Sequence, residues 1–148
     1  MSALLLVVEI AGARVALRSC ETESVVELDT LLPVPRAAPH VAGLSALRSR
    51  VLTVIDAKRS LDLGDSDCSD GIREAVVVEL DGHHYALLVD KVEDVVESLS
   101  EPSPVRGAME AGWERVARGM VETETGPILV VDVAALVAGA DGPRAAAA

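Results

Sequence analysis

Aromatic side chains are almost absent from this sequence. Among its 148 residues there is no phenylalanine, one tryptophan and one tyrosine. Half of the residues are hydrophobic, so a core has to be assembled from valine, leucine, isoleucine and alanine. Valine is stiff and packs well on a pleated surface, so this composition favours strands over helices. The length is that of one domain or two small ones.

Basic residues are also scarce, with 13 Lys and Arg against 24 Asp and Glu and a net charge of −11. This balance argues against a nucleic-acid-binding protein, which needs clustered Lys and Arg, and against docking on anionic lipid. The two cysteines, Cys20 and Cys68, have no metal-ligand spacing and indicate free thiols in a reducing compartment. The apolar start from Ala3 to Val8 is short and meets Glu9 at once, so we expect a cytoplasmic protein without membrane insertion.

The sequence contains one pattern twice. Residues 7–17 return as residues 77–87, at an offset of 70 that brings Gly12 onto Gly82. Further along, Gly43 and residues 52–56 return at an offset of 76, so the second copy carries about six extra residues, which we place within 106–115. This repeat predicts two similar modules related by a pseudo-twofold axis, with a groove between them.

Each copy is predicted to form about five short strands. Ala11-Gly12 and Asp81-Gly82 mark tight hairpin turns, because both positions of a type I′ turn need positive φ. Small antiparallel sheets of this size curl into barrels that remove their edges. We therefore expect an all-β fold of two five-stranded SH3-like barrels with short helical segments. The expected order is a first barrel over 1–63, a linker over 64–72, a second barrel over 73–139 and a disordered tail over 140–148.

Three stretches of the sequence resemble motifs of CheW-like proteins. Residues 43–56, GLSALRSRVLTVID, resemble the family pattern G-V-x-N-L-R-G-x-V-x-P-V-I-D. Residues 88–92, LVDKV, resemble L-V-D-x-V, and residues 24–28 followed by 32–35 resemble V-x-E-V followed by T-P-V-P. The pieces come in the order of the family and span nearly the whole chain.

This resemblance implies a non-catalytic adaptor without cofactor or metal. Such proteins couple the cytoplasmic tips of chemoreceptors to a chemotaxis histidine kinase in signalling arrays. The receptor lies in the groove between the barrels, and the regulatory domain of the kinase packs end to end against a barrel. By match to the family, the receptor-binding residues are Val25, Glu27, Leu28, Leu47, Arg48, Val89 and Val92. Alternatively, some of these residues belong to the core.

The chain departs from the motif where Ala46, Ser49 and Thr53 replace Asn, Gly and Pro. These departures fall near the expected kinase-binding region, and the loss of glycine suggests a changed turn. One alternative is therefore a divergent member that binds receptors but not the kinase and modulates array assembly. A more remote alternative is a small barrel enzyme, for which the sequence offers no nucleophile or phosphate-binding motif.

The remaining polar residues are expected to be structural. His83 and His84 follow a hairpin turn and point to opposite faces of a strand, so a solvated turn is favoured over a metal site. His40, beside a proline, is expected at the surface. Trp113 is expected to anchor the inserted helix to the second barrel. The acidic stretch 62–70 lacks the order of a calcium-binding loop and is expected to be a solvated linker.

Overall fold

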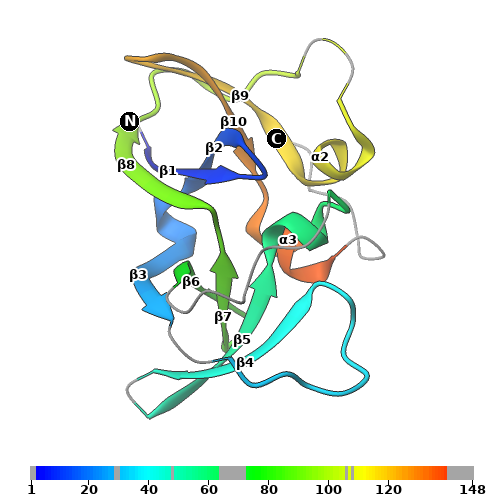
Figure 1. The fold of residues 1–148 in the computed structure, drawn as a ribbon. Coiled ribbons are helices and arrows are strands. Elements are labelled where there is room, and N and C mark those ends of the chain that lie inside the picture. Colours follow the sequence, from blue (N-terminus) through cyan, green and yellow to red (C-terminus); the bar gives the residue numbers. More distant parts are fainter. Residues whose placement is uncertain are drawn as a thin grey trace.

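A computed structural model describes residues 3–28, 31–47, 49–63, 73–105, 107 and 109–139. Ten strands and a few short helices run along these residues (Figure 1). The strands are β1 (Leu4–Ile10), β2 (Ala13–Arg18), β3 (Thr22–Leu28), β4 (Val41–Leu47), β5 (Arg50–Asp56), β6 (Arg73–Leu80), β7 (His83–Leu88), β8 (Lys91–Glu97), β9 (Ala117–Thr123) and β10 (Gly126–Val131). The helices are the 3₁₀ turn η1 (Ser19–Glu21), α1 (Ala57–Ser60), α2 (Ala111–Val116) and α3 (Val133–Ala138). None of the described helices has the length and apolarity that crossing a bilayer requires.

The strands form two five-stranded sheets of equivalent topology. Sheet A has the order β8-β1-β2-β10-β9, and sheet B has the order β3-β6-β7-β5-β4. In each sheet the contact between two hairpins is parallel, through β2 and β10 in sheet A and through β5 and β7 in sheet B. The neighbouring pairs are antiparallel. The predicted class, all-β with two five-stranded barrels and short helices, is confirmed.

The two sheets exchange their first hairpins. Sheet A contains β1 and β2 of the first copy with β8, β9 and β10 of the second, and sheet B contains the reverse combination. The expectation that residues 1–63 and 73–139 would each form one barrel is therefore wrong. The cause is η1, after which the chain leaves sheet A and enters sheet B as β3 instead of continuing beside β2. The linker expected over 64–72 and the tail expected over 140–148 lie outside the described residues.

The pseudo-twofold relationship predicted from the repeat is visible in the backbone. Ala11-Gly12 has φ of 52° and 80°, and Asp81-Gly82 has φ of 51° and 80°. Asp56 caps the start of α1 by accepting from the amide of Arg59, as Asp132 caps α3 by accepting from Ala135. The predicted equivalence of Asp56 and Asp132 is confirmed.

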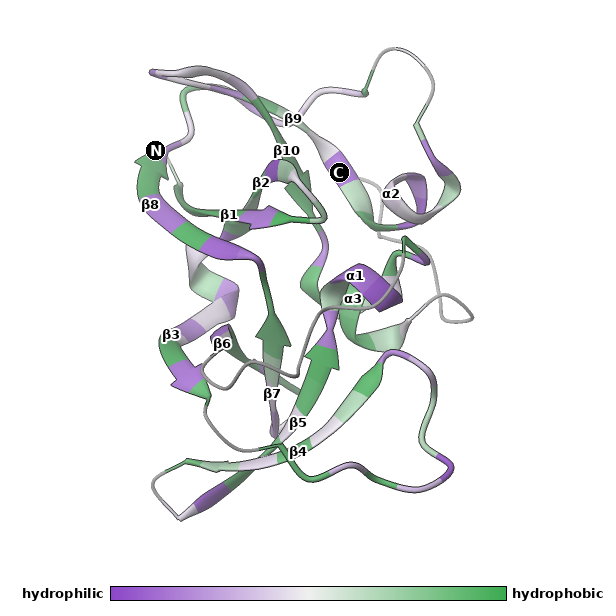
Figure 2. Cartoon of the chain, viewed as in Figure 1, coloured by the Kyte–Doolittle hydropathy of each residue, from purple (hydrophilic) through white to green (hydrophobic). Residues whose placement is uncertain are grey.

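The apolar side chains divide into three clusters because successive residues of a strand point to opposite faces. Alternate residues of β1 serve different cores: Leu5 and Val7 fill the interior of sheet A, while Leu6 and Val8 enter a joint core between the sheets. The joint core is the largest cluster and draws on both sheets and on α1, α2 and α3. A separate cluster fills sheet B. Coloured by hydropathy, β5 and β7 are mostly apolar, whereas β8 alternates (Figure 2).

Candidate interaction surfaces

The edge strands β3 and β8 expose equivalent residues. Each lies at the end of its sheet, and both are at the left of the view in Figure 1. Their burial patterns are the same residue by residue from Thr22 to Leu28 and from Val92 to Ser98. Val25 is 46% exposed and its counterpart Val95 is 51% exposed. Residues 25–28 of β3 pair with β6 on one side only, which leaves the other edge open.

The structure separates the predicted receptor-binding residues into surface and core. Val25 and Glu27 are exposed on β3. Leu28 and Val89 are buried, at 6% and 7% exposure, so their side chains do not reach a partner. The two remaining described residues, Leu47 and Val92, are partly buried against the cores of sheet B and of the joint region. Arg48 lies outside the described residues.

Val95 is a surface residue that the motif comparison missed. The repeat at offset 70 would have found it, since Val95 is the counterpart of Val25.

An apolar patch lies beside the predicted kinase-binding region. Leu31, Leu32, Leu44, Ser45, Ala46 and Val51 line a groove of about 420 Å³, which we call the Leu32 patch. Leu32 and Val51 are 67% and 64% exposed, which is unusual for large apolar side chains. The amide of Leu32 donates to the carbonyl of Leu44, and the reverse bond also forms, so the loop is held against β4. Leu32 and Val51 lie within the motif stretches, but the motifs did not mark either residue as a contact.

The three departures from the family motif lie on β4, on β5 and in the turn between them, the hairpin that supplies part of the patch. Ala46 is exposed and lines the patch, and Thr53 is partly buried on β5. Ser49 is exposed with a φ of 68°, the left-handed conformation that glycine adopts without steric cost. The turn at Ser49 thus has a backbone conformation suited to the glycine of the motif.

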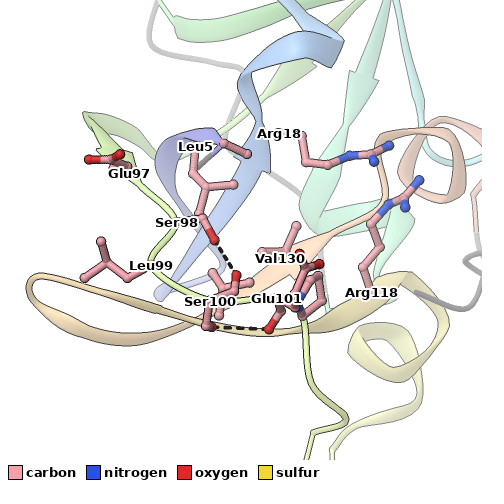
Figure 3. Close-up of a pocket in the computed structure, with 12 residues that line it drawn as sticks. Leu5, Arg18, Glu97, Ser98, Leu99, Ser100, Glu101, Arg118 and Val130 are labelled. Carbon is pink, nitrogen blue, oxygen red and sulfur yellow. Dashed lines mark hydrogen bonds between the residues drawn. The ribbon is translucent and has the colours of Figure 1, made fainter. Parts of the chain in front are cut away.

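A cavity of about 730 Å³ opens at the end of sheet A (Figure 3). Leu5, Val121 and Val130 supply its apolar wall, and Arg18 and Arg118 border it from β2 and β9. At the equivalent positions of sheet B, the described residues are apolar and packed. Arg18, Ser98, Glu101 and Arg118 in sheet A correspond to Leu88, Leu28, Leu31 and Ala42 in sheet B.

The polar groups around this cavity are largely engaged. The Arg18 guanidinium donates from Nε to Glu21 Oε1 at 2.9 Å, and this hydrogen bond raises the pKa of Arg18. Arg118 lies 3.4 Å from Asp132, while its Nε is the single buried side-chain polar atom without a partner in the described part of the chain. The Ser98 hydroxyl donates to the Ser100 carbonyl at 2.8 Å (Figure 3). The residues lining the cavity include no imidazole and no thiol.

The histidines differ from expectation. His40 is 9% exposed and its Nε2 lies 2.7 Å from the carbonyl oxygen of Val137, so the predicted surface position is wrong. The reason is that the end of α3 packs over the loop that carries His40. His83 is exposed, as expected for a turn, whereas His84 is partly buried and contacts Glu23 and Glu79. Trp113 packs against the joint core, which draws on both sheets and not on the second copy alone.

Two five-stranded units share one core and carry exposed apolar residues on an edge strand and on a loop patch. These features define a twin-barrel interaction protein. The model of the CheW-like domain matches residues 4–141, and the chain therefore belongs to the CheW-like family. Among solved structures, the scaffolding protein TtCheW from Thermoanaerobacter tengcongensis has the same fold, with a TM-score of 0.73 and 23% identity over 90% of each chain. No curated protein gives a significant sequence match.

Proposed function

We propose that this protein is a non-catalytic scaffold that couples the cytoplasmic tips of chemoreceptors to the regulatory domain of a chemotaxis histidine kinase. The observation that carries the proposal is the family match, which spans residues 4–141 and thus nearly the whole chain. In this proposal the protein works in cytoplasmic receptor arrays and uses no cofactor.

The proposed receptor contact is the exposed face of β3. Val25 offers an apolar side chain next to the carboxylate of Glu27, on a strand whose outer edge is open. An amphipathic receptor helix would lay its apolar stripe over Val25 and pair its polar flank with Glu27 and with Arg48, which the family motif assigns to the same groove. In this proposal Leu28 and Leu47 support the face from the core of sheet B, whereas Val89 and Val92 act indirectly through the joint core.

The proposed kinase contact is the Leu32 patch with the adjoining residues Ala46, Ser49 and Thr53. Leu32 and Val51 together expose a contiguous apolar surface on one end of sheet B. Covering such a surface with the end of a second barrel would remove apolar area from water, at about 25 cal/mol per Å² before association costs.

The conformation of Ser49 favours the coupling role over the alternative of a receptor-binding protein that ignores the kinase. The alternative assumes that the loss of glycine altered this turn. The φ of Ser49 is positive, however, as expected for a glycine at the same position. Ser49 itself therefore has the backbone conformation that a glycine at this position would adopt.

The receptor contact is tested by titrating a receptor-tip fragment against variants with matched exposure. Val25→Asp is expected to weaken binding at least tenfold, about 1.4 kcal/mol. Val95→Asp, the same change at the equivalent and equally exposed position of β8, is the control and leaves affinity unchanged. Arg48→Ala and Glu27→Lys are each expected to cost about 1.5–3 kcal/mol, roughly ten- to a hundredfold. Equal effects of Val25→Asp and Val95→Asp would reject β3 as the specific contact.

The kinase contact is tested by reconstituting an array with receptor, kinase and this protein as the sole scaffold. The coupling role predicts kinase activation, and Leu32→Ser is expected to reduce it while receptor binding stays intact. Receptor binding without kinase activation would favour the divergent alternative. The double variant Ser49→Gly, Ala46→Asn would then test whether these two positions cause the loss of activation.

A further inference from the structure

Two carboxylates and an imidazole meet on the outer surface of sheet B. His84 Nε2 on β7 lies 3.1 Å from Glu23 Oε2 on β3 and 3.1 Å from Glu79 Oε2 on β6. The three ligand atoms all lie within 4.8 Å of one another, and across the described ranges no other trio of His, Cys, Asp or Glu is this close. The three strands are neighbours in the sheet, so the group spans both copies of the sequence.

The backbone fixes how these side chains converge. Glu79 and His84 are directly opposite partners of the β6–β7 hairpin. Glu23 is the additional residue of a β-bulge, since Thr22 and Ser24 pair with the consecutive residues Val78 and Val77. A bulge turns its extra side chain away from the regular alternation, and here it brings Glu23 onto the face of Glu79 and His84. Three ordered strands therefore hold the ligand atoms without help from a loop.

Sheet A contains the same arrangement with one decisive difference. At an offset of 70, Glu93, Glu9 and Arg14 correspond to Glu23, Glu79 and His84. Glu9 and Arg14 are again cross-strand partners, a bulge again places the third residue, and Arg14 Nε lies 3.1 Å from Glu93 Oε2. Both carboxylate pairs thus face one nitrogen-bearing side chain. In sheet A it is a permanently charged guanidinium, whereas in sheet B it is an imidazole with a nitrogen that can ligate a metal.

We propose that Glu23, Glu79 and His84 bind a divalent transition-metal cation of the Zn²⁺ class. One imidazole and two carboxylates form a nitrogen and oxygen set that suits Zn²⁺, with ligand bonds of about 2.0–2.2 Å. The imidazole separates this class from Ca²⁺ and Mg²⁺, which prefer oxygen alone. Arg50 holds the other oxygen of Glu23, with Nη1 at 2.9 Å from Oε1, and so leaves Oε2 directed toward His84. The metal would supply in sheet B the charge that Arg14 supplies in sheet A.

The test is a calorimetric titration of the full chain with Zn²⁺ alone, supported by Co²⁺ absorption spectra that report tetrahedral nitrogen and oxygen ligation. We expect one site. His84→Ala is expected to weaken Zn²⁺ binding at least tenfold. Loss of a residue that only orients a metal ligand typically costs about ten- to a hundredfold in metal affinity, and loss of the ligand itself should cost no less. His83→Ala is the matched control, since His83 is the neighbouring residue and points away from the cluster, and it should bind as the parent chain does.

The two copies supply a further pair of variants. His84→Arg reproduces the arrangement of sheet A and is expected to abolish the site with an unchanged thermal melt. Arg14→His reproduces the arrangement of sheet B and is expected to raise the stoichiometry from one to two. The titrations are repeated in a Cys20→Ser, Cys68→Ser background to remove thiolate ligands. Absence of Zn²⁺ binding, unchanged affinity in His84→Arg, or a stoichiometry of one in Arg14→His would each overturn the proposal.

Discussion

The hydroxyl of Ser60 donates a hydrogen bond of 2.6 Å to the carbonyl oxygen of Leu136, a residue 76 positions further along the chain. This separation equals the repeat offset, so the bond joins a residue to its own counterpart in the other copy. The pseudo-twofold axis therefore passes close to this pair, between the ends of α1 and α3. Arg115 of α2, which belongs to the inserted segment and has no helical counterpart in the first copy, binds across the same place.

Arg115→Met is expected to lower the free energy of unfolding by about 2–4 kcal/mol. The buried guanidinium of Arg115 donates to the carbonyls of Ala135 and Ser60 and to the Ser60 hydroxyl. Its removal takes a donor from the buried carbonyl and hydroxyl of Ser60 and leaves the Ala135 carbonyl with only the amide of Gly139. Burial lowers the pKa of Arg115 and so opposes its charge. Urea denaturation measures the loss, and Arg36→Met, at an exposed loop position, is the control with little effect. Equal midpoints for the two variants would contradict the role of Arg115.

Gly112→Ala is expected to destabilise the protein by about 1–3 kcal/mol, although alanine is the better helix former. A Cβ at Gly112 would lie 1.9 Å from the backbone carbonyl oxygen of Leu61, which a rotamer change cannot relieve. The comparison is Ala134→Gly in α3, an exposed helical position where loss of alanine costs about 1 kcal/mol through helix propensity alone. Thermal melts of both variants measure these effects. Stabilisation by Gly112→Ala would show that α2 does not pack closely against the end of α1.

Ser49→Gly is expected to stabilise the chain by about 1 kcal/mol. The φ of 68° at Ser49 is unfavourable for any residue with a Cβ and costs glycine nothing. Ser24→Gly is the opposite case, because Ser24 lies in a strand, where glycine costs roughly 0.5–1 kcal/mol. Chemical denaturation should therefore move the two midpoints in opposite directions, and a loss of stability in Ser49→Gly would contradict the assigned turn.

Fragments that follow the sequence copies are expected to be unfolded alone and to fold when mixed. A fragment of residues 1–63 lacks β6 and β7 from the middle of sheet B, and a fragment of residues 64–148 lacks β1 and β2 from the middle of sheet A. Circular dichroism and amide spectra of each fragment and of their mixture measure this. A folded 1–63 fragment would show that the first copy can close a barrel by itself.

The elements and their symmetry could be predicted from the sequence, because they depend on local patterns. The Asp-Gly turn at 81–82 and the repeat were enough to predict the hairpins. The partners of each hairpin could not be predicted in this way. Neighbouring strands usually pair, and only the path of the chain after η1 decides that β3 joins the other sheet.

The surface residues were predicted less completely than the fold. Family motifs predicted Leu28 and Val89 as receptor-binding residues. The structure places both in cores, because their side chains face inward. Exposure of Leu32 and Val51 depends on how the loop lies along β4, which no spacing encodes. The grouping of Glu23 with His84 required knowledge that β3 and β7 flank β6.

The exchange of hairpins also governs when the protein can fold during its synthesis. β1 and β2 leave the ribosome well before their sheet A partners β9 and β10, because the second copy of the pattern follows the first. Neither sheet can close until the second copy has emerged, so the valine-rich strands of the first copy wait in an unpaired state. Contacts of such long sequence separation fold slowly and expose apolar segments to aggregation. We therefore expect the nascent chain to keep apolar strand surfaces uncovered until β10 has emerged.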